Sequence, residues 1–265
     1  MKSNRKLEIK DILNKDSIAV FTDASVNNKN GTVCSGAVTV DENFDTKYTD
    51  VVLSDATVTR GELMAIKIGI EEGLKTGKSI INLFSDSMVC IKSLREWIFN
   101  WEKNGRKFNK LINSSRETVV YSDLLMEIVD IIVKNEHVKI NLFHQKGHIG
   151  EGNYPYSKIK RLFHTNNGFI IDDKFIDIMK IYNNMVDNYT RNNLNIAPRV
   201  GRSFTPHESL MFNIDSDVIQ KYKKIANIKI GGDNVEGRHR SNNKRSKFKV
   251  RKFGKRQRNN SYTPK

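Results

Sequence analysis

The spacing of apolar residues changes from period two to helical spacing and back, and this alternation constrains the fold more than any other feature. Short apolar or alternating runs at 17–22, 32–41 and 46–53 are typical of β-strands, with turn-forming residues between the first two. Helical spacing begins at 58–75, where the apolar residues share one face. An antiparallel three-stranded meander followed by a helix is therefore expected.

The alternation continues along the chain in the order strand, helix, helix, strand and helix. These elements are predicted at 79–85, 88–101, 121–134, 137–143 and 181–194. Ser122 is the expected N-cap of the third helix. Strands that alternate with helices after a meander predict an α/β fold, in which a mixed five-stranded sheet carries helices on both faces. Ligand sites in such folds gather at the carboxyl ends of the strands.

Positive charge is concentrated at the C-terminus. The formal net charge is +15, and residues 238–265 hold twelve Lys or Arg but no Asp or Glu. The rest of the chain is close to neutral. A block of like charge stays unfolded, so 238–265 is predicted to be a disordered arm that contacts the nucleic-acid backbone. The alternative is a tail that serves only solubility.

Several classes of protein are not expected. No apolar run approaches the roughly 18 residues that span a bilayer. Residues 1–16 carry acids and lack the apolar core of a secretion signal, so they are interpreted as an N-terminal extension. Cys34 and Cys90 are the only cysteines, too few for a disulfide scaffold. We expect a monomer in the reducing cytoplasm, without membrane contact.

Three acids stand among apolar residues that belong in a core. Asp23 ends the first strand, Glu62 lies in the first turn of the first helix, and Asp86 ends the fourth strand. One such acid alone is usually a turn former, an N-cap or a helix-dipole partner. Three that converge need cations, because buried carboxylates without partners cost several kcal/mol. Divalent ions such as Mg²⁺ prefer these oxygens, so the sequence proposes a metal-dependent nuclease.

At these residues the chain resembles type 1 ribonuclease H, within the wider retroviral-integrase-like group of nucleases, over about residues 17–194. TDAS, GELMAI and SDS match the family's first three metal-binding acids in order. QKGH resembles its flexible loop with a catalytic histidine, here His148. NNMVDNYTRN resembles its last motif, whose acid begins the final helix; here that acid is Asp187.

The resemblance implies a fold, a cofactor and a substrate. The fold would be the ribonuclease H-like sheet, and the substrate an RNA–DNA hybrid whose RNA strand is cut by an endonuclease. Two Mg²⁺ ions, with Mn²⁺ as a possible replacement, would be held by Asp23, Glu62, Asp86 and Asp187. His148 would assist proton transfer or product release.

The resemblance also implies contacts to the hybrid. WIFNWEKNGRK at 97–107 resembles the start of the basic protrusion that grips the hybrid in many type 1 enzymes. Trp97 and Trp101 are alternatively a core pair at i, i+4, and Trp101 is expected in the core. The residues expected to contact nucleic acid are Asn27, Asn28, Thr57, Arg60, Met88, Trp97, Lys103, Arg106, Lys107 and Lys110.

Two departures from the family pattern leave alternatives open. Val58 and Thr59 replace the Asn or Gln that usually precede the metal-binding Glu. Three rival functions therefore remain: a junction resolvase, a nuclease for double-stranded RNA, or a non-catalytic module that binds a hybrid. The second departure is an insertion at 149–180, between the QKGH motif and the last motif. Beyond the family match, residues 195–237 form an extension of unknown role.

The insertion and the strand before it also hold rivals for two of the site residues. Asp172, Asp173 and Asp177 compete with Asp187 for the place of the fourth carboxylate. His144 competes with His148, although a histidine on a strand is more often structural.

Overall fold

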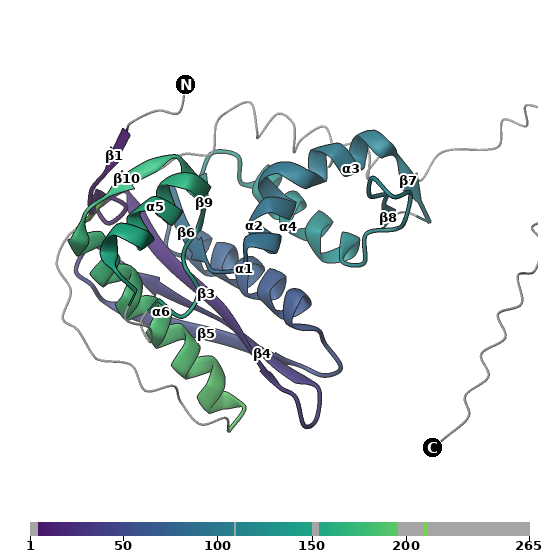
Figure 1. Ribbon diagram of the computed structural model, residues 1–265, viewed down its shortest axis with the longest axis horizontal. Coiled ribbons are helices and arrows are strands. Elements are labelled where there is room, and N and C mark those ends of the chain that lie inside the picture. Colours follow the sequence, from purple (N-terminus) through teal and green to yellow (C-terminus); the bar gives the residue numbers. More distant parts are fainter. Residues whose placement is uncertain (1–4, 109, 150–153, 196–208, 211–265) are drawn as a thin grey trace, which may run out of the picture. The chain divides into compact units, whose positions relative to one another are not determined.

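A mixed five-stranded sheet forms the centre of the molecule. The computed structural model describes residues 5–108, 110–149, 154–195 and 209–210 (Figure 1). The sheet order is β5-β4-β3-β6-β9, antiparallel between the first three strands and parallel between the last three. The strands are β3 (Ser17–Asn27), β4 (Thr32–Val40), β5 (Thr46–Leu53), β6 (Ile80–Ser85) and β9 (Lys139–His144). The predicted fold class is confirmed.

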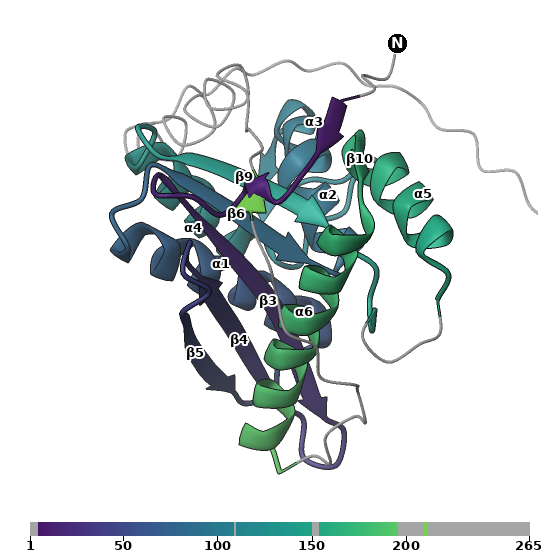
Figure 2. The same cartoon turned by 90° about the vertical axis from the view of Figure 1, so that its left-hand side faces the viewer.

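Helices cover both faces of this sheet. One face carries α1 (Val58–Lys75), α2 (Met88–Lys92), the π-helical turn η1 (Ser93–Trp97), α3 (Ile98–Asn104) and α4 (Ser122–Lys134). The other carries α5 (Tyr156–Asn167) and α6 (Asp173–Asn193). Figure 2 shows α6 crossing β3 and β4 on the side opposite α1. None of the helices among the described residues is long and apolar enough to cross a membrane.

Alternation along β3 explains the two layers. Ile18 and Val20 pack with the helices of the α1 face, while Ala19 and Phe21 pack with α5 and α6. All four side chains are almost fully buried. A strand that is apolar on both faces belongs in the middle of a sheet, with helices on each side.

Aromatic rings fill the core on the α6 face. Phe21, Phe84 and Phe143 occupy matching register positions on β3, β6 and β9, and their ring centroids are 4.9 and 5.0 Å apart in turn. Phe163 of α5 and Phe175 of α6 continue the cluster. The insertion is therefore part of the core and not an appendage.

The N-terminal segment packs on the same face. Leu7, Ile12 and Leu13 are buried in this aromatic core. β1 (Arg5–Leu7) pairs in parallel with β10 (Phe169–Ile171) of the insertion. The remaining short strands are β2 (Lys10–Asp11), β7 (Arg106–Lys107), β8 (Lys110–Leu111) and β11 (Ser209–Leu210), paired β2 with β11 and β7 with β8.

Three details differ from the sequence predictions. β3 continues to Asn27 because β4 pairs with it beyond the end of β6. Ser122 is the first residue of α4 and not its N-cap; its hydroxyl donates to Val119 O and accepts from Leu111 N. The last helix begins at Asp173, because the insertion supplies apolar residues in helical register with it. The predictions for 238–265 and for nearly all of 195–237 lie outside the described residues.

Candidate active site

The register of two parallel strands brings two of the acids together. Thr22 and Ser85 form the last register pair between β3 and β6. Asp23 and Asp86 are the next residues along each chain, so they lie side by side at the carboxyl end of β6. Asp23 remains inside β3, paired with Gly36 of β4, and does not end its strand as predicted. Strand register thus fixes the spacing of these carboxylates.

Helix α1 brings the third acid. Thr57 is the N-cap of α1, and its hydroxyl accepts from Arg60 N at 3.2 Å. Gly61 allows the first turn to lie directly against the sheet, since a Cβ there would meet Val33 Cγ1 at 2.4 Å. The next residue, Glu62, therefore reaches in toward the sheet. The predicted helix bounds of 58–75 agree with those observed.

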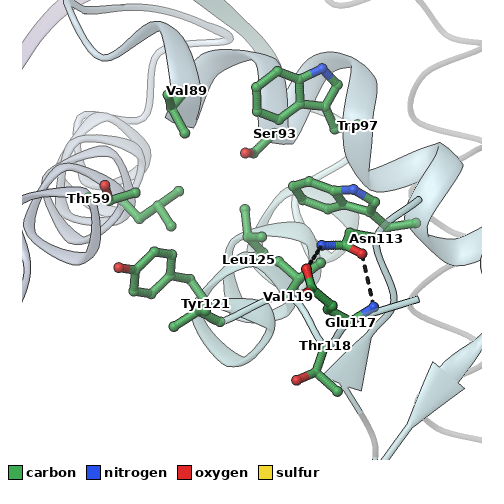
Figure 3. A pocket seen from close by; sticks show the side chains of 13 residues that line it. Thr59, Val89, Ser93, Trp97, Asn113, Glu117, Thr118, Val119, Tyr121 and Leu125 are labelled. Carbon is green, nitrogen blue, oxygen red and sulfur yellow. Dashed lines mark hydrogen bonds between the residues drawn. The ribbon is translucent and has the colours of Figure 1, made fainter. Parts of the chain in front are cut away.

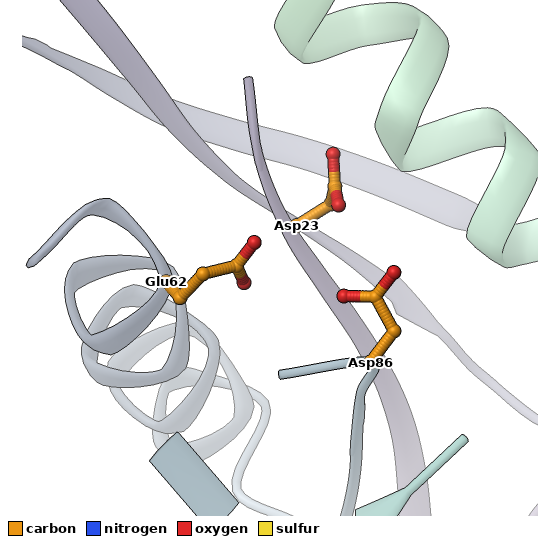
Figure 4. A group of neighbouring side chains, drawn as sticks. All are labelled: Asp23, Glu62 and Asp86. Carbon is orange, nitrogen blue, oxygen red and sulfur yellow. The ribbon is translucent and has the colours of Figure 1, made fainter. Parts of the chain in front are cut away.

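The three carboxylates form one cluster, shown in Figure 4. One oxygen from each of Asp23, Glu62 and Asp86 lies within 4.8 Å of the others. Asp23 and Glu62 are each 6% exposed. The Ala24 amide donates to the Glu62 carboxylate, whereas Glu62 Oε2 is buried and makes no hydrogen bond. Burial, followed by repulsion from Asp23 and Asp86, raises the pKa of Glu62 well above its ordinary value.

The carboxylate of Asp86 is also partly buried next to another acid, but nearby basic groups partly offset this. Burial raises the pKa of its carboxyl, the charge on His148 lowers it, Asp187 raises it, and Lys146 lowers it again. Carboxylates that repel one another in a buried place are stabilised by a cation between them. An all-oxygen donor set favours a hard divalent ion such as Mg²⁺. The buried, unsatisfied Glu62 Oε2 fits such a ligand, so these residues are suited to hold the predicted metal.

Asp187 faces the cluster from α6 but is not one of its three members. It lies late in the 21-residue helix and does not begin it, which corrects the prediction from the family motif. The side chain is buried and its charge acts on Asp86. Thr190, one turn later, donates to Asp23 Oδ2 at 3.3 Å and ties this part of α6 to β3.

The rival acids lie at the far end of the same helix. Asp172 is the N-cap of α6, accepting from Phe175 N at 3.0 Å. Asp173 pairs with Lys160, and Asp177 accepts the Tyr156 hydroxyl. At 1.5 Å rise per residue, Asp173 is about 21 Å from Asp187 along the axis. None of the three rivals is in the carboxylate cluster.

The QKGH segment forms a turn directly over Asp86. A Cβ on Gly147 would meet Asp86 Oδ2 at 2.9 Å, so a side chain at this position would displace the Asp86 carboxylate. The next residue, His148, is exposed and has a left-handed backbone with φ of 50°. Ile149 is fully buried and anchors the turn from the other side. The structure therefore places an accessible imidazole whose charge reaches Asp86.

His144 has a structural environment. Its Nε2 donates to the carbonyl oxygen of Asp86 at 3.1 Å, because Nδ1 accepts from Asn166 Nδ2 at 2.9 Å. Burial lowers its pKa to about 4, so the ring is neutral near pH 7. Asn167 exchanges two hydrogen bonds with the backbone of His144, at 2.9 and 2.8 Å. The insertion thus holds the end of β9 and, through His144, the turn that carries Asp86.

An aromatic groove lies beside the cluster, between α1, the α2–α3 segment and the chain leading into α4 (Figure 3). Its volume is about 340 Å³. Trp97 and Trp101 form part of the wall, with ring centroids 5.9 Å apart. Trp101 packs on the hydrophobic core, as predicted for it, and Tyr121 lines the groove near Thr59. The structure thus presents Trp97 and Tyr121 on a hollow surface.

The basic residues predicted to contact nucleic acid divide into two groups. Lys103, Lys107 and Lys110 are exposed around α3, β7 and β8. Arg106 is instead paired with Glu102 at 3.1 Å and is mostly covered. Arg60 is paired with Asp123 at 2.8 Å. The three lysines therefore keep their charge available, whereas the two arginines share theirs with an acid.

The other predicted contacts lie on separate elements. Asn27 is the last residue of β3 and Asn28 begins the turn to β4, and Asn27 Oδ1 accepts from Lys29 N at 3.1 Å. Thr57 hydrogen bonds with the Tyr121 hydroxyl at 2.6 Å, so part of its polar capacity is used inside the protein. Met88 begins α2, two residues after Asp86, and is half-buried.

Sequence reasoning did not assign a role to three residues near the site. Lys146 acts on Asp86, Thr190 holds Asp23, and Tyr121 lines the groove. Lys146 lies within the QKGH motif, so its position offered a signal. Thr190 lies one helical turn after Asp187, which places both on one face of α6. Tyr121 had no such signal, because a long polar segment positions it.

Comparison with known proteins shows similarity to ribonucleases H. A family model described as RNase H matches residues 15–156, which contain Asp23, Glu62, Asp86 and His148 but not Asp187. The chain is 30% identical over 135 residues to ribonuclease H of Pseudomonas fluorescens, covering 51% of this chain and 83% of that protein. It is 34% identical over 139 residues to ribonuclease HI of Haemophilus influenzae, covering 50% of this chain and 79% of that protein.

A solved structure is also similar. RNase H1 from the halophilic archaeon Halobacterium salinarum aligns with a TM-score of 0.34 and 16% identity, covering 49% of this chain and 85% of that one. The family model spans more than half of the chain, and the sequence motifs predicted the same family. The chain therefore belongs to the RNase H family.

Proposed function

We propose that this protein is a metal-dependent endonuclease that hydrolyses the RNA strand of RNA–DNA hybrids. The observation that carries the proposal is the meeting of Asp23, Glu62 and Asp86 within 4.8 Å, with a buried Glu62 oxygen that has no hydrogen bond. Bound divalent ions supply an activated water and a stabilised leaving oxygen in phosphodiester hydrolysis. Membership of the RNase H family supports the choice of a hybrid as substrate.

The residues of the chain have separate tasks in this proposal. Asp23, Glu62 and Asp86 hold the metal, and Asp187 adds negative charge from α6. His148 is exposed above Asp86, where an imidazole can accept or deliver a proton as the scissile bond breaks. The groove beside Trp97 and the exposed Lys103, Lys107 and Lys110 would hold the DNA strand by stacking and charge.

The proposal extends to the cofactor, the arm and the setting of the enzyme. Mg²⁺ is the proposed ion and Mn²⁺ a replacement, because all the donors are carboxylate oxygens. The arm at 238–265 is proposed to contact the nucleic-acid backbone, since it holds twelve basic residues. Its deletion should flatten the salt dependence of hybrid binding without removing cleavage. A monomer in the cytoplasm is proposed from the two free cysteines and the sequence composition.

Cleavage of defined substrates tests the proposal. End-labelled RNA–DNA hybrid, double-stranded RNA, double-stranded DNA and a four-way junction are incubated with the full chain in Mg²⁺, in Mn²⁺ and in EDTA. We expect metal-dependent cutting of the RNA strand of the hybrid alone. Cutting of the junction or of double-stranded RNA would assign the site to another substrate. Binding of the hybrid without cutting would overturn catalysis altogether.

A further inference from the structure

The insertion brings a second set of cations next to the carboxylates. Tyr154, just before α5, is shared by two lysines: Lys146 Nζ lies 4.6 Å from its ring centroid, and Lys158 Nζ lies 5.5 Å from it. Lys146 belongs to the turn that crosses Asp86, and Lys158 to the first turns of α5. An aromatic ring attracts cations to its face, but two ammonium groups on one ring repel each other.

The acids of the insertion that the structure describes have other partners. Asp177 accepts the Tyr156 hydroxyl, and Asp173 pairs with Lys160 at 2.7 Å. In the part of the chain that the structure describes, no ion pair engages Lys158 or Arg161. Both side chains are exposed, and they lie three residues apart on one face of α5. Lys158 and Arg161, together with Lys146 of the neighbouring turn, are here termed the α5 basic surface.

The α5 basic surface is continuous with the carboxylate cluster. Lys146 Nζ donates to the carbonyl oxygen of Gly147 at 2.6 Å, and Gly147 packs so closely on Asp86 that a Cβ there would meet Asp86 Oδ2 at 2.9 Å. Tyr154 connects it to Lys158, and Arg161 follows one turn further along the helix. The groove with Trp97 lies on the other helical face of the sheet, among α1, α3 and the chain before α4. Cations therefore lead away from the cluster toward α5, on the side opposite the groove.

We propose that the α5 basic surface binds backbone phosphates of the RNA strand next to the one that is cut. The occupant follows from charge complementarity: a row of cations that begins beside a phosphodiester-cleaving centre fits a polyanion that continues out of that centre. This inference rests on the proposed function, because the strand at the carboxylates is taken to be RNA. It assigns the insertion a role in substrate binding.

Binding measurements on charge variants test the inference. Lys158→Gln/Arg161→Gln is compared with the full unmodified chain by fluorescence anisotropy on a labelled RNA–DNA hybrid, in EDTA to prevent cutting, from 50 to 300 mM salt. We expect about tenfold weaker binding near 0.1 M salt and a salt slope that is shallower by about 2, one unit for each lost phosphate contact.

A matched pair of lysines provides the control. Lys15 and Lys134 are exposed near the amino ends of β3 and β9, away from the cluster, so Lys15→Gln/Lys134→Gln removes the same charge elsewhere. This control should bind with nearly the original slope. Equal slopes for the two double variants would overturn the inference. If the unmodified chain cleaves no RNA–DNA hybrid, the proposed function is overturned instead. Failure of the inference and failure of the proposed function are therefore distinguishable.

Substitutions at the shared ring give a second, independent readout. Tyr154→Phe keeps the aromatic face that holds Lys146 and Lys158, whereas Tyr154→Leu removes it. We expect unchanged hybrid binding for the phenylalanine variant and about threefold weaker binding for the leucine variant. Circular dichroism and thermal unfolding confirm that both are folded. Equal binding by the two folded variants would show that the ring does not organise these cations.

Discussion

The two helical layers of the molecule contribute to the site in different ways. The α1 layer supplies Glu62, a buried member of the carboxylate cluster, and an aromatic groove beside it. The α6 layer supplies Asp187, which faces Asp86 from outside the cluster, together with exposed cations on α5. The sheet between them contributes Asp23 and Asp86.

This difference indicates a division of labour across the sheet. The α1 layer places its acid by close backbone packing at Gly61, so the position of Glu62 is fixed. The α6 layer acts on Asp86 through the charge of Asp187, and α5 holds His144, whose ring donates to the Asp86 carbonyl. We infer that the first layer determines whether the metal binds, and that the second adjusts how substrate and Asp86 are held.

The largest expected effect is on cleavage, when the acid of the α1 layer is replaced and compared with the acid of the α6 layer. Glu62→Gln should reduce hybrid cleavage by at least about 10³-fold, because it removes a cluster ligand. Asp187→Asn should reduce it by about tenfold, since Asp187 lies outside the cluster. Single-turnover cleavage rates measure both. Glu71→Gln, on the partly exposed side of the same helix, is the control for Glu62. An equal loss in Glu62→Gln and Asp187→Asn would remove the distinction between the layers.

The groove should bind hybrid with little dependence on salt, in contrast to α5. Trp97→Ala is expected to weaken hybrid binding by about tenfold while leaving the salt dependence of binding unchanged, because stacking involves no counterion release.

Trp101→Ala should mainly lower the free energy of unfolding, by about 2 kcal/mol, because Trp101 packs on the core. Tyr189→Ala, an exposed aromatic on α6, controls for ring loss. A shallower slope for Trp97→Ala would contradict the assignment.

The metal-free protein should lose stability as pH rises. The pKa of Glu62 and that of Asp86 are raised in the folded chain above their ordinary values of 4.5 and 3.8. The folded chain therefore binds more protons than the unfolded chain between the ordinary and raised values, and stability falls as pH increases through that window. Thermal unfolding in EDTA from pH 4 to 8 measures this decline.

Glu62→Gln should reverse much of that effect. With the buried charge removed, we expect a stability gain of about 1–2 kcal/mol at pH 7 in EDTA and a flatter pH profile. Added Mg²⁺ should stabilise the unmodified chain and leave Glu62→Gln nearly unaffected. A destabilised Glu62→Gln with the original pH profile would indicate that the carboxylate is satisfied within the protein.

The smallest expected effect concerns His144. His144→Leu removes the donor to the Asp86 carbonyl, and we expect a threefold to tenfold rise in the Mg²⁺ concentration for half-maximal cleavage. His144→Gln retains a donor and should restore most of the original value. If both variants need the same Mg²⁺ as the unmodified chain, the second layer does not act on Asp86 through this ring.

The regular elements and the acids were predictable because their patterns are local. The bounds of α1 follow from its helical spacing, and its first turn carries Glu62. Asp23 and Asp86 stand out because each follows a run of apolar strand residues and because both occur together with Glu62. Parallel register then brings the two together without any further information.

The features that the sequence did not predict depend on contacts between distant segments of the chain. Strands of three residues, such as β1 and β10, are too short to show a period, so their pairing left no sequence signal. The place of Asp187 within α6 was missed because the insertion continues the helix toward the N-terminus. The groove needs Tyr121 beside Trp97, and a polar segment of irregular structure determines that meeting.

The pairing of β1 with β10 also has a consequence for folding. Arg5 must find Phe169 across most of the described chain, and Leu7 closes the same core as Phe163 and Phe175. Contacts of such high sequence separation form late, because a large loop must close before they stabilise anything. During synthesis, β1 leaves the ribosome before β10 and cannot pair until β10 has been made. The α1 layer is therefore able to assemble first, and the aromatic core closes as the final step.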